Sequence, residues 1–209
     1  MKKSEIREVE RVEDFAGVYK VFGEKPYEEK YTEEDFKEIY EEYKALGNIY
    51  GAYVDDKCVG LIAILKGKRK GQPVEFDEDD SSLAYLADIA VLSEYRAAGL
   101  GTKLMIDALM RTKMDGFRTM YMRTLEKGES MSYGIAKKVG FEQIEGVSQM
   151  VETENIRGER QVKKNIFLSI DLNNLDKNKV KSALMEGRFV KRDDSRNVET
   201  EDTIVGDDR

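Results

Sequence analysis

The sequence predicts an α/β domain of the α+β kind, built on one mixed and mostly antiparallel sheet. An apolar segment at residues 83–92 runs through a glycine-containing turn into an amphipathic helix, which is typical of a βα unit. Two apolar segments, 49–54 and 58–65, flank a short polar turn and predict a hairpin. A second pair, 142–152 and 161–171, is joined in a similar way. These patterns require both hairpin-paired strands and strands that helices connect.

The elements outside those patterns complete the order β-α-α-β-β-β-α-β-α-β-β. They are recognised by apolar side chains at helical or alternating spacing and by glycines at the ends of helices. The loop at residues 66–81 is rich in charge and is expected to stay outside the core. The remaining expected strands lie at residues 6–9 and 117–125. Four helices are also expected: the first ends at Gly23, the second runs from the Thr32 cap to Gly47, the third follows Gly101, and the fourth spans residues 130–139.

Composition limits the class of protein. The chain has 209 residues, of which 40% are hydrophobic and 37% charged, enough for one substantial domain with an appendage. It contains no histidine, so we expect no metal site and no histidine-dependent catalytic triad. A net charge of −7 argues against a nucleic-acid partner. Because no apolar run is long enough for a membrane span and Cys58 is the one cysteine, we expect a cytoplasmic protein without a membrane partner.

The turn after the 83–92 segment has the spacing Arg96-x-x-Gly99-x-Gly101. Glycines let the backbone approach a ligand closely, and the free N–H groups at the start of the next helix favour an anion. A Walker loop is excluded because no glycine stands at the required distance before Lys103, and a dinucleotide fingerprint because Leu104 replaces its third glycine. The turn therefore predicts another kind of phosphate cradle, with an ordinary tight turn as the alternative.

This motif and the order of elements around it resemble the GNAT superfamily of acyl-CoA-dependent N-acetyltransferases. The resemblance covers roughly residues 4–172 and includes the Gly140-Phe141 pair. It implies a GNAT fold: a mixed sheet of about seven strands, splayed between strands 4 and 5 and flanked by about four helices. Residues 1–172 would form this domain. Residues 173–209 would be a C-terminal extension, with one possible helix that turns Val180, Leu184 and Met185 inward and an acidic, flexible tail.

The resemblance also implies acetyl-CoA as co-substrate. In the family, N–H groups of this loop bind the pyrophosphate of coenzyme A, and Arg96 would assist as a cation. A backbone N–H near Val91 would hold the thioester oxygen at the splayed edge. Ser130 would cap the helix that it precedes and contact the cofactor. The expected cofactor-binding residues are Val91, Arg96, Ala97, Ala98, Gly99, Leu100, Gly101, Thr102 and Ser130.

The proton route departs from the family pattern. The family often has a tyrosine four residues before the Gly-Phe pair, where this chain has Ala136. Tyr133 lies three residues earlier, on nearly the same helix face, and is the candidate acid. Relatives with a glutamate base carry it where this chain has Tyr85 or Ala87. Asp88 is the acid in the apolar part of this strand, and it faces away from those two positions unless a bulge intervenes.

The candidate catalytic residues are therefore Tyr133, Asp88 and Tyr85. Packing by Tyr133, a structural role for Asp88, and ordered water as the base are open alternatives. Tyr40 and Tyr43 either line an acceptor pocket or pack in the core.

The resemblance implies transfer of an acetyl group from acetyl-CoA to a primary amine by direct attack. The amine belongs to a small molecule or a protein, and the acidic stretches mildly favour a cationic one. A homodimer is expected, since edge strands of this family often pair. A non-catalytic acyl-CoA sensor or interaction module of the same fold is the alternative function, and a mononucleotide-binding protein is a third.

Overall fold

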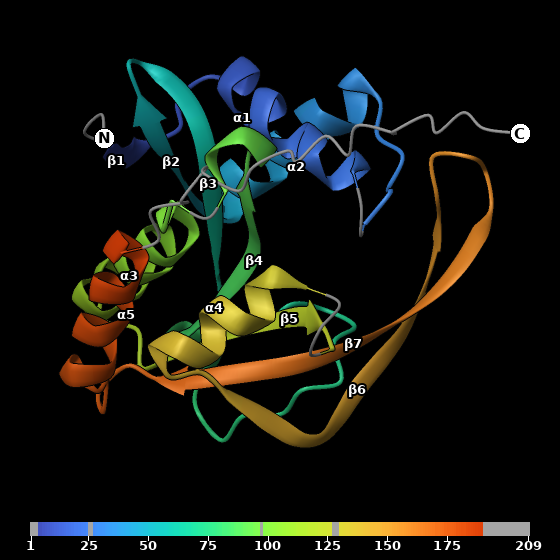
Figure 1. Cartoon of the computed structure of the whole chain (residues 1–209). Coiled ribbons are helices and arrows are strands. Elements are labelled where there is room, and N and C mark those ends of the chain that lie inside the picture. The colour runs from blue at the N-terminus through green and yellow to red at the C-terminus, as the bar shows by residue number, and fades with distance from the viewer. Residues whose placement is uncertain (1–3, 25–26, 97, 127–129, 190–209) are drawn as a thin grey trace, which may run out of the picture.

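The computed structural model describes residues 4–24, 27–96, 98–126 and 130–189. Within them a seven-stranded sheet has the order β1-β2-β3-β4-β5-β7-β6 (Figure 1). β4 and β5 pair in parallel and all other neighbours pair antiparallel, which confirms the predicted sheet. The strands are β1 (Glu5–Glu8), β2 (Gly47–Val54), β3 (Lys57–Lys66), β4 (Leu83–Val91), β5 (Thr119–Leu125), β6 (Glu142–Glu154) and β7 (Arg160–Asp171).

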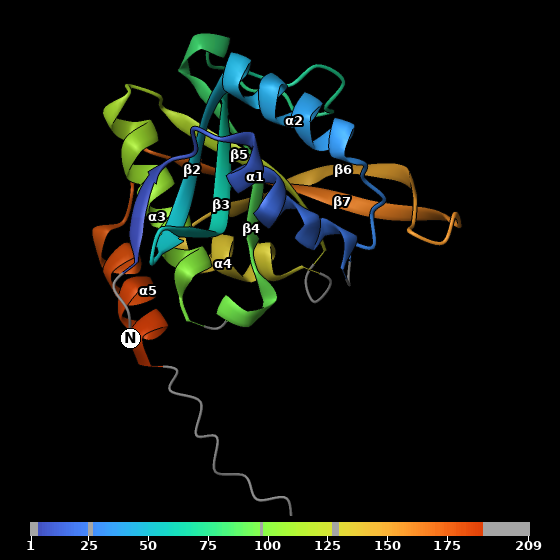
Figure 2. The ribbon, with the colours of Figure 1, turned by 90° about the horizontal axis from the view of Figure 1, so that it is seen from above.

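Helices cover both faces of the sheet (Figures 1 and 2). α1 (Val12–Tyr19) and α2 (Glu33–Leu46) lie on one face. α3 (Leu100–Met114), α4 (Met131–Val139) and α5 (Lys177–Phe189) lie on the other. None of the helices in the described ranges is long and apolar enough to cross a membrane.

Local signals explain both ends of α2. The hydroxyl group of Thr32 accepts a hydrogen bond of 3.2 Å from the backbone N–H of Asp35, whose carboxylate accepts from the backbone N–H of Thr32 at 2.6 Å. The Thr32 cap is the one expected from the sequence, and the bond from Thr32 N–H to Asp35 makes it reciprocal. At the other end, a Cβ on Gly47 would lie 2.0 Å from the carbonyl oxygen of Ile64. Glycine is therefore required because β2 begins there in close contact with β3.

Apolar clusters fill both layers. Under α3, α4 and α5, the cluster is centred on the fully buried Leu104, Met105 and Leu109. A second cluster lies beneath α1 and α2. A third, smaller cluster includes Tyr121 and also contains Val74 of the 66–81 loop. The expectation that this loop stays outside the core is wrong for Val74, because the loop folds back over the sheet and buries this side chain completely.

β4 and β5 separate after four paired residues. They pair from Leu83 to Leu86, and no described residue of β5 pairs with β4 beyond that point (Figure 1). On the other edge of β4, Leu86 pairs with Ile64 and Asp88 pairs with Ala63, so Ala87 is an extra residue. Such an insertion is a β-bulge. The predicted splay is confirmed, and it leaves one edge of β4 open.

α5 joins the same core as α3 and α4. Val180 and Ala183 are buried in the cluster beneath these helices, and Leu184 packs against it. Met185 is 51% exposed, so the expectation that it faces inward is wrong. Val180, Ala183 and Leu184 form the buried face at i, i+3 and i+4. Met185 follows Leu184, and because each residue turns a helix by about 100°, its side chain leaves that face. The predicted acidic tail, residues 191–209, lies outside the described ranges.

Candidate active site

The predicted phosphate turn forms the N-terminus of α3. Gly99 has φ of +76°, in the left-handed region that favours glycine, and is the residue before the first helical turn. The first backbone hydrogen bond of the helix runs from Lys103 N to Gly99 O, at 3.0 Å. The N–H groups of Leu100, Gly101 and Thr102 therefore precede the helical hydrogen-bond ladder. Together with the helix dipole, they can receive an anion.

The second glycine of the motif has a different role. A Cβ on Gly101 would lie 2.8 Å from Cδ1 of Ile135, so this glycine allows α3 and α4 to pack closely. Ala98 is exposed just before the turn. The predicted contribution of Ala97 lies outside the described residues.

Arg96 is held by the protein itself. Its Nε donates a hydrogen bond of 3.1 Å to the carbonyl oxygen of Val91. Its Nη2 lies 3.4 Å from Oε2 of Glu24, which also accepts a hydrogen bond from the Ser93 hydroxyl group. The sequence suggests a cation for the pyrophosphate, whereas the structure places this guanidinium in an ion pair that joins the end of β4 to the segment after α1. A phosphate at Arg96 would compete with Glu24.

The backbone of Val91 points toward the open edge of β4. Leu92 N donates to Val59 O at 2.9 Å, which makes Val91 and Gly60 a pair without hydrogen bonds between them. In antiparallel pairing, the N–H and C=O groups of such a residue point away from the partner strand. The alternation gives Ile89 the same orientation. Two backbone donors thus face the gap between the splayed strands, near the predicted position.

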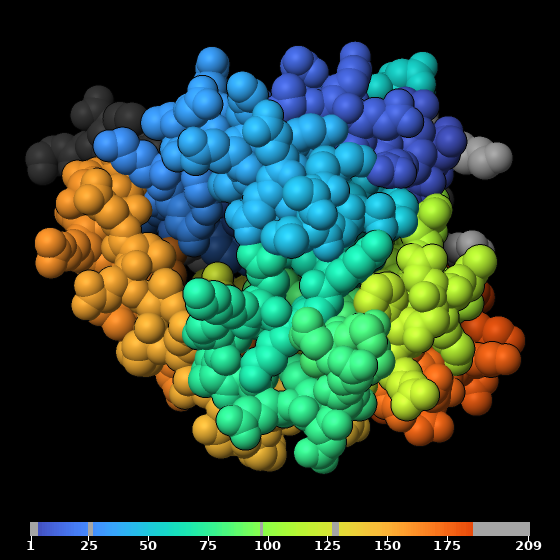
Figure 3. All heavy atoms as spheres, turned by 180° about the vertical axis from the view of Figure 1, so that it is seen from behind, coloured from blue at the N-terminus to red at the C-terminus, as the bar shows by residue number. Residues whose placement is uncertain are grey.

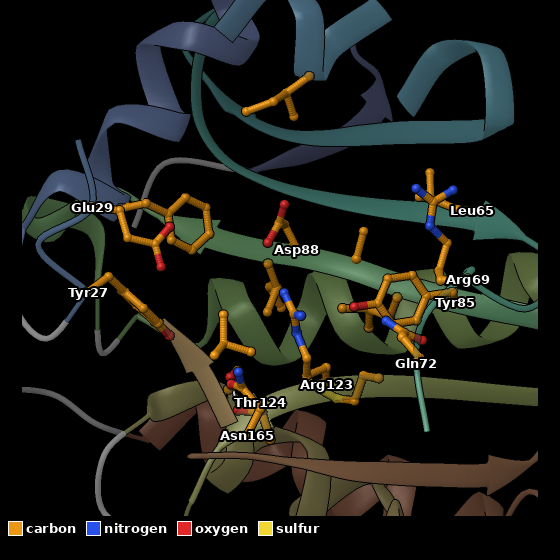
Figure 4. Close-up of a pocket in the computed structure, with 18 of the residues that line it drawn as sticks. Tyr27, Glu29, Leu65, Arg69, Gln72, Tyr85, Asp88, Arg123, Thr124 and Asn165 are labelled. Atoms are coloured by element: carbon orange, nitrogen blue, oxygen red, sulfur yellow. Dashed lines mark hydrogen bonds between the residues drawn. The ribbon is translucent and has the colours of Figure 1, made fainter. Parts of the chain in front are cut away.

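A cavity of about 480 Å³ lies where β4 and β5 separate. Side chains from both strands, from the α1 and α2 layer and from the β6–β7 hairpin line it (Figure 4). On the surface, the recess opens between the hairpin and the N-terminal helices (Figure 3). Asp88 and Tyr85 line the cavity, as does Tyr43. Tyr40 instead packs in the cluster beneath α1 and α2.

Asp88 is the central acid of this cavity. Its Oδ2 accepts a hydrogen bond of 2.8 Å from the hydroxyl group of Tyr19 and another from that of Tyr43. Its Oδ1 accepts none from the described residues, so it is available to a ligand. Burial raises the pKa of Asp88 to about 6, although both tyrosine hydroxyl groups act in the opposite direction. Burial also raises the pKa of Tyr19 and of Tyr43, so both remain donors near neutral pH.

The bulge explains how Asp88 enters the cavity. Strict alternation would turn Asp88 away from Tyr85, whereas the extra residue Ala87 reverses the alternation and brings both side chains to the same face. Opposite faces are expected only in the absence of a bulge, and β4 contains one. Tyr85 packs its ring against Tyr121, with centroids 5.0 Å apart. Because burial raises the pKa of Tyr85, its hydroxyl group stays protonated and cannot act as a base at neutral pH.

Tyr133 lies outside the cavity lining. It is partly buried against the cluster beneath α3, α4 and α5. Ser132, on the same helix, lines the cavity instead. Ser132 stands four residues before the fully buried Ala136, hence on the same helix face. This spacing is the signal in the sequence that could have identified it.

Ser132 belongs to a chain of hydroxyl groups that crosses three segments. Its Oγ lies 2.8 Å from Oγ1 of Thr124 on β5 and 2.5 Å from Oγ of Ser130. Ser130 caps α4 as expected, accepting from Ser132 N at 3.1 Å, and its Oγ lies 3.1 Å from the hydroxyl oxygen of Tyr27. Each of these contacts can carry its proton in either direction.

The described residues contain no group of three or more Cys, Asp or Glu side chains placed to hold a metal ion.

The tip of the β6–β7 hairpin closes one side of the cavity, where it contacts the segment after α1. Glu29 and Asn155 form an isolated antiparallel bridge. Next to it, Ile156 N donates to Glu28 O at 2.8 Å, and the ammonium group of Lys163 donates to the carbonyl oxygen of Tyr27. Sequence reasoning identified neither this closure nor Arg123, a cavity residue on β5.

Comparisons with known proteins agree with this architecture. A sequence model described as the Acetyltransferase (GNAT) family matches residues 13–141. Curated proteins give no match.

The chain is also similar to solved structures at 13–16% identity. An N-acetyltransferase from Staphylococcus aureus Mu50 has a TM-score of 0.61 at 16% identity, over 81% of this chain and 99% of that one. yncA from Salmonella typhimurium, solved with its cofactor acetyl-CoA, has 0.59 at 13%, over 82% and 95%. The ribosomal-protein-S18-alanine N-acetyltransferase from Escherichia coli has 0.60 at 13%, over 84% and 98%. At these identities the likeness concerns the fold.

Proposed function

Since the chain belongs to the GNAT acetyltransferase family, we propose that it transfers an acetyl group from acetyl-CoA to a primary amine by direct attack. One observation carries the proposal. The bulge at Ala87 places the carboxylate of Asp88 in the cavity beside the open edge of β4, where backbone N–H groups have no strand partner among the described residues. A base and an oxyanion donor thus lie on one strand, within a few residues of each other.

The donor half of the site is the turn before α3. Its N–H groups, from Gly99 to Thr102, would hold the pyrophosphate of coenzyme A. The guanidinium of Arg96 would keep the end of β4 against this turn through its hydrogen bond to Val91. The N–H of Val91, or that of Ile89, would then donate to the thioester oxygen, because both point into the gap between the strands.

The acceptor half is the cavity. Oδ1 of Asp88 accepts a proton from the amine, whose nitrogen lone pair attacks the carbonyl carbon of the thioester. The tetrahedral intermediate collapses with cleavage of the C–S bond, which releases the amide and the thiolate of coenzyme A. The thiolate then takes up one proton. Asp88 suits this role because its pKa of about 6 makes it ionised yet basic near neutral pH.

The returning proton has two candidate sources on α4. The hydroxyl chain through Ser132 reaches the cavity directly, whereas Tyr133 lies one residue further along the helix and outside the lining. We propose that Ser132 relays this proton and that Tyr133 contributes mainly by packing. Ser132→Ala should then lower turnover more than Tyr133→Phe, which removes one hydroxyl group and keeps the ring.

Release of free thiol from acetyl-CoA, measured with a panel of primary amines, tests the function. Asp88→Asn should lower the rate by at least about 100-fold, the usual range for loss of a general base. The matched control is Asp107→Asn, which alters an acid on α3 that pairs with Arg111 away from the cavity.

Two outcomes would replace the proposal. Binding of coenzyme A without thiol release for any amine would favour the non-catalytic sensor. Equal competition by ATP and coenzyme A would favour a mononucleotide-binding protein.

A further inference from the structure

The charge of the cavity differs from the charge of the chain. The whole sequence carries a net charge of −7, yet four basic and three acidic side chains line the cavity. The acidic stretches therefore give no reason to expect a purely cationic acceptor at this site. These side chains are Arg69, Lys70, Arg123, Lys163, Glu29, Glu42 and Asp88.

Two of the four basic groups are already engaged. The guanidinium of Arg69 pairs with Glu42, and the ammonium group of Lys163 donates to a backbone carbonyl. Lys70 lies on an exposed turn. The guanidinium of Arg123 forms no ion pair or hydrogen bond with any described residue. Arg123 is exposed, as is Lys70, but among the described residues it is the unpaired cation that a strand of the sheet presents to the cavity.

The position of Arg123 is set by the splay. It follows Met122, whose partner Leu86 is the last paired residue of β4. Figure 4 shows Arg123 pointing from β5 toward the carboxyl group of Asp88 across the cavity. The two groups form no ion pair, although the positive charge of Arg123 slightly lowers the pKa of Asp88. The cavity therefore has the unpaired guanidinium of Arg123 on one side and the unpaired Oδ1 of Asp88 on the other.

Further polar atoms in the lining lack partners. Oε1 of Gln72, Oε1 of Gln149 and Oγ1 of Thr153 are shielded from solvent and form no hydrogen bond with the described residues. Leaving such an atom unpaired costs about 1–3 kcal/mol. Each has less than 1 Å² of accessible surface, so a ligand in the cavity would reach these atoms only after neighbouring side chains move.

From this arrangement we infer that the acceptor is a small zwitterionic amine of the amino-acid type. Its amino group binds Oδ1 of Asp88, and its carboxylate binds the guanidinium of Arg123, a geometry that guanidinium groups favour. A small molecule fits because the cavity holds about 480 Å³ and the hairpin tip bounds it on one side. The inference rests on the proposed function for its reaction, and on the cavity alone for its binding.

The test compares three matched forms of each acceptor: the free L-amino acid, its C-terminal amide and its decarboxylated amine. The wild-type protein should release thiol with the free amino acid at a kcat/KM at least about 10-fold above that with either other form, as loss of a charged hydrogen bond predicts. Arg123→Gln should remove this preference by raising KM for the amino acid, while KM for acetyl-CoA stays unchanged. Arg123→Lys should retain part of it. Arg118→Gln is the control, since Arg118 precedes β5 and does not line the cavity.

A binding measurement separates failure of this inference from failure of the proposed function. Calorimetric titration of the free amino acids into protein saturated with coenzyme A should show binding that Arg123→Gln weakens and Arg118→Gln leaves intact. If the amino acids bind in this way but no thiol is released, the zwitterion site stands and acetyl transfer is rejected. Preference for the amide or the decarboxylated amine, or equal losses for all three forms in folded Arg123→Gln, would overturn the inference. So would the absence of both binding and turnover.

Discussion

The hydroxyl group of Tyr19 donates a hydrogen bond of 2.8 Å to Oδ2 of Asp88, 69 residues further along the chain. Tyr43, from α2, donates to the same oxygen. Two helices that precede most of the sheet in sequence thus orient the one acid that the bulge brings into the cavity. The first three predictions follow from this triad.

The rate of acetyl transfer should depend on the ionisation of Asp88. Only the carboxylate can accept a proton, so kcat/KM should fall tenfold per pH unit below a midpoint of about 6. The measurement is a pH profile of thiol release with one amine. Asp88→Asn should abolish the midpoint as well as most of the rate. A midpoint that survives in this variant would assign the titration to another group.

Removal of one hydrogen-bond donor should move that midpoint upward. The hydroxyl groups of Tyr19 and Tyr43 stabilise the charged carboxylate and lower its pKa, so Tyr19→Phe and Tyr43→Phe should each shift the profile to higher pH. Tyr40→Phe is the control, because its hydroxyl group faces the carbonyl oxygen of Val9 instead. An unchanged midpoint in both cavity variants would mean that these hydrogen bonds do not persist in solution.

The ionised carboxylate should also lower stability. The pKa of Asp88 is raised in the folded protein, so the folded state binds more protons than the unfolded state between about pH 4 and 6. Stability is lost as pH rises through that window. Asp88→Asn should therefore be more stable than wild type at pH 7.5, by about 1–2 kcal/mol, and nearly equal at pH 4. Thermal unfolding at both pH values gives the comparison, and a less stable variant at pH 7.5 would contradict it.

Gly99 and Gly101 at the cofactor turn and Gly134 on α4 should respond differently to alanine. Gly99→Ala places a side chain at φ of +76° and should cost about 1 kcal/mol of stability and weaken binding of coenzyme A. Gly101→Ala should have a smaller effect, since the tip of Ile135 can move. Gly134→Ala should stabilise the protein by about 0.5–1 kcal/mol, because nothing lies within 4 Å of the new Cβ in α4. Unfolding curves and titrations with coenzyme A distinguish the three.

The ion pair between Arg96 and Glu24 should compete with the cofactor. Glu24→Gln removes the negative charge 3.4 Å from the guanidinium and should tighten binding of coenzyme A a few-fold at low salt. Glu94→Gln, at an exposed ion pair with Lys57, serves as the control. Weaker binding in Glu24→Gln would show that the pair positions the turn rather than competing for it.

The order of elements could be predicted because each has a local signal. The hydrophobic period, the Thr32 cap and the glycines act within a few residues, and the structure places every expected strand and helix close to its predicted range. The cap of α4 at Ser130 follows the same logic. The strand predicted from residue 117 begins at Thr119, because the N–H of Phe117 still bonds to the last turn of α3.

The interior of the site could not be predicted in the same way. The face of Asp88 depends on how β4 pairs with β3, and neither strand carries a local signature of the bulge at Ala87. The partners of Asp88 are 45 and 69 residues away, so no spacing rule identifies them. Arg123 did leave a signal, a charge within an apolar strand, which is the pattern that drew attention to Asp88.

The contact of the hairpin tip with Glu28 and Glu29 means that the first and last parts of the domain together shape the acceptor half, whereas the cofactor turn comes from the middle of the chain. Substitutions near either end can therefore reshape the walls around Asp88 and Arg123, which β4 and β5 supply, without disturbing the donor half. A chimera that exchanged residues 27–31 together with 149–163 would keep Asp88, Arg123 and the cofactor turn, and would change the space left for the rest of the amine.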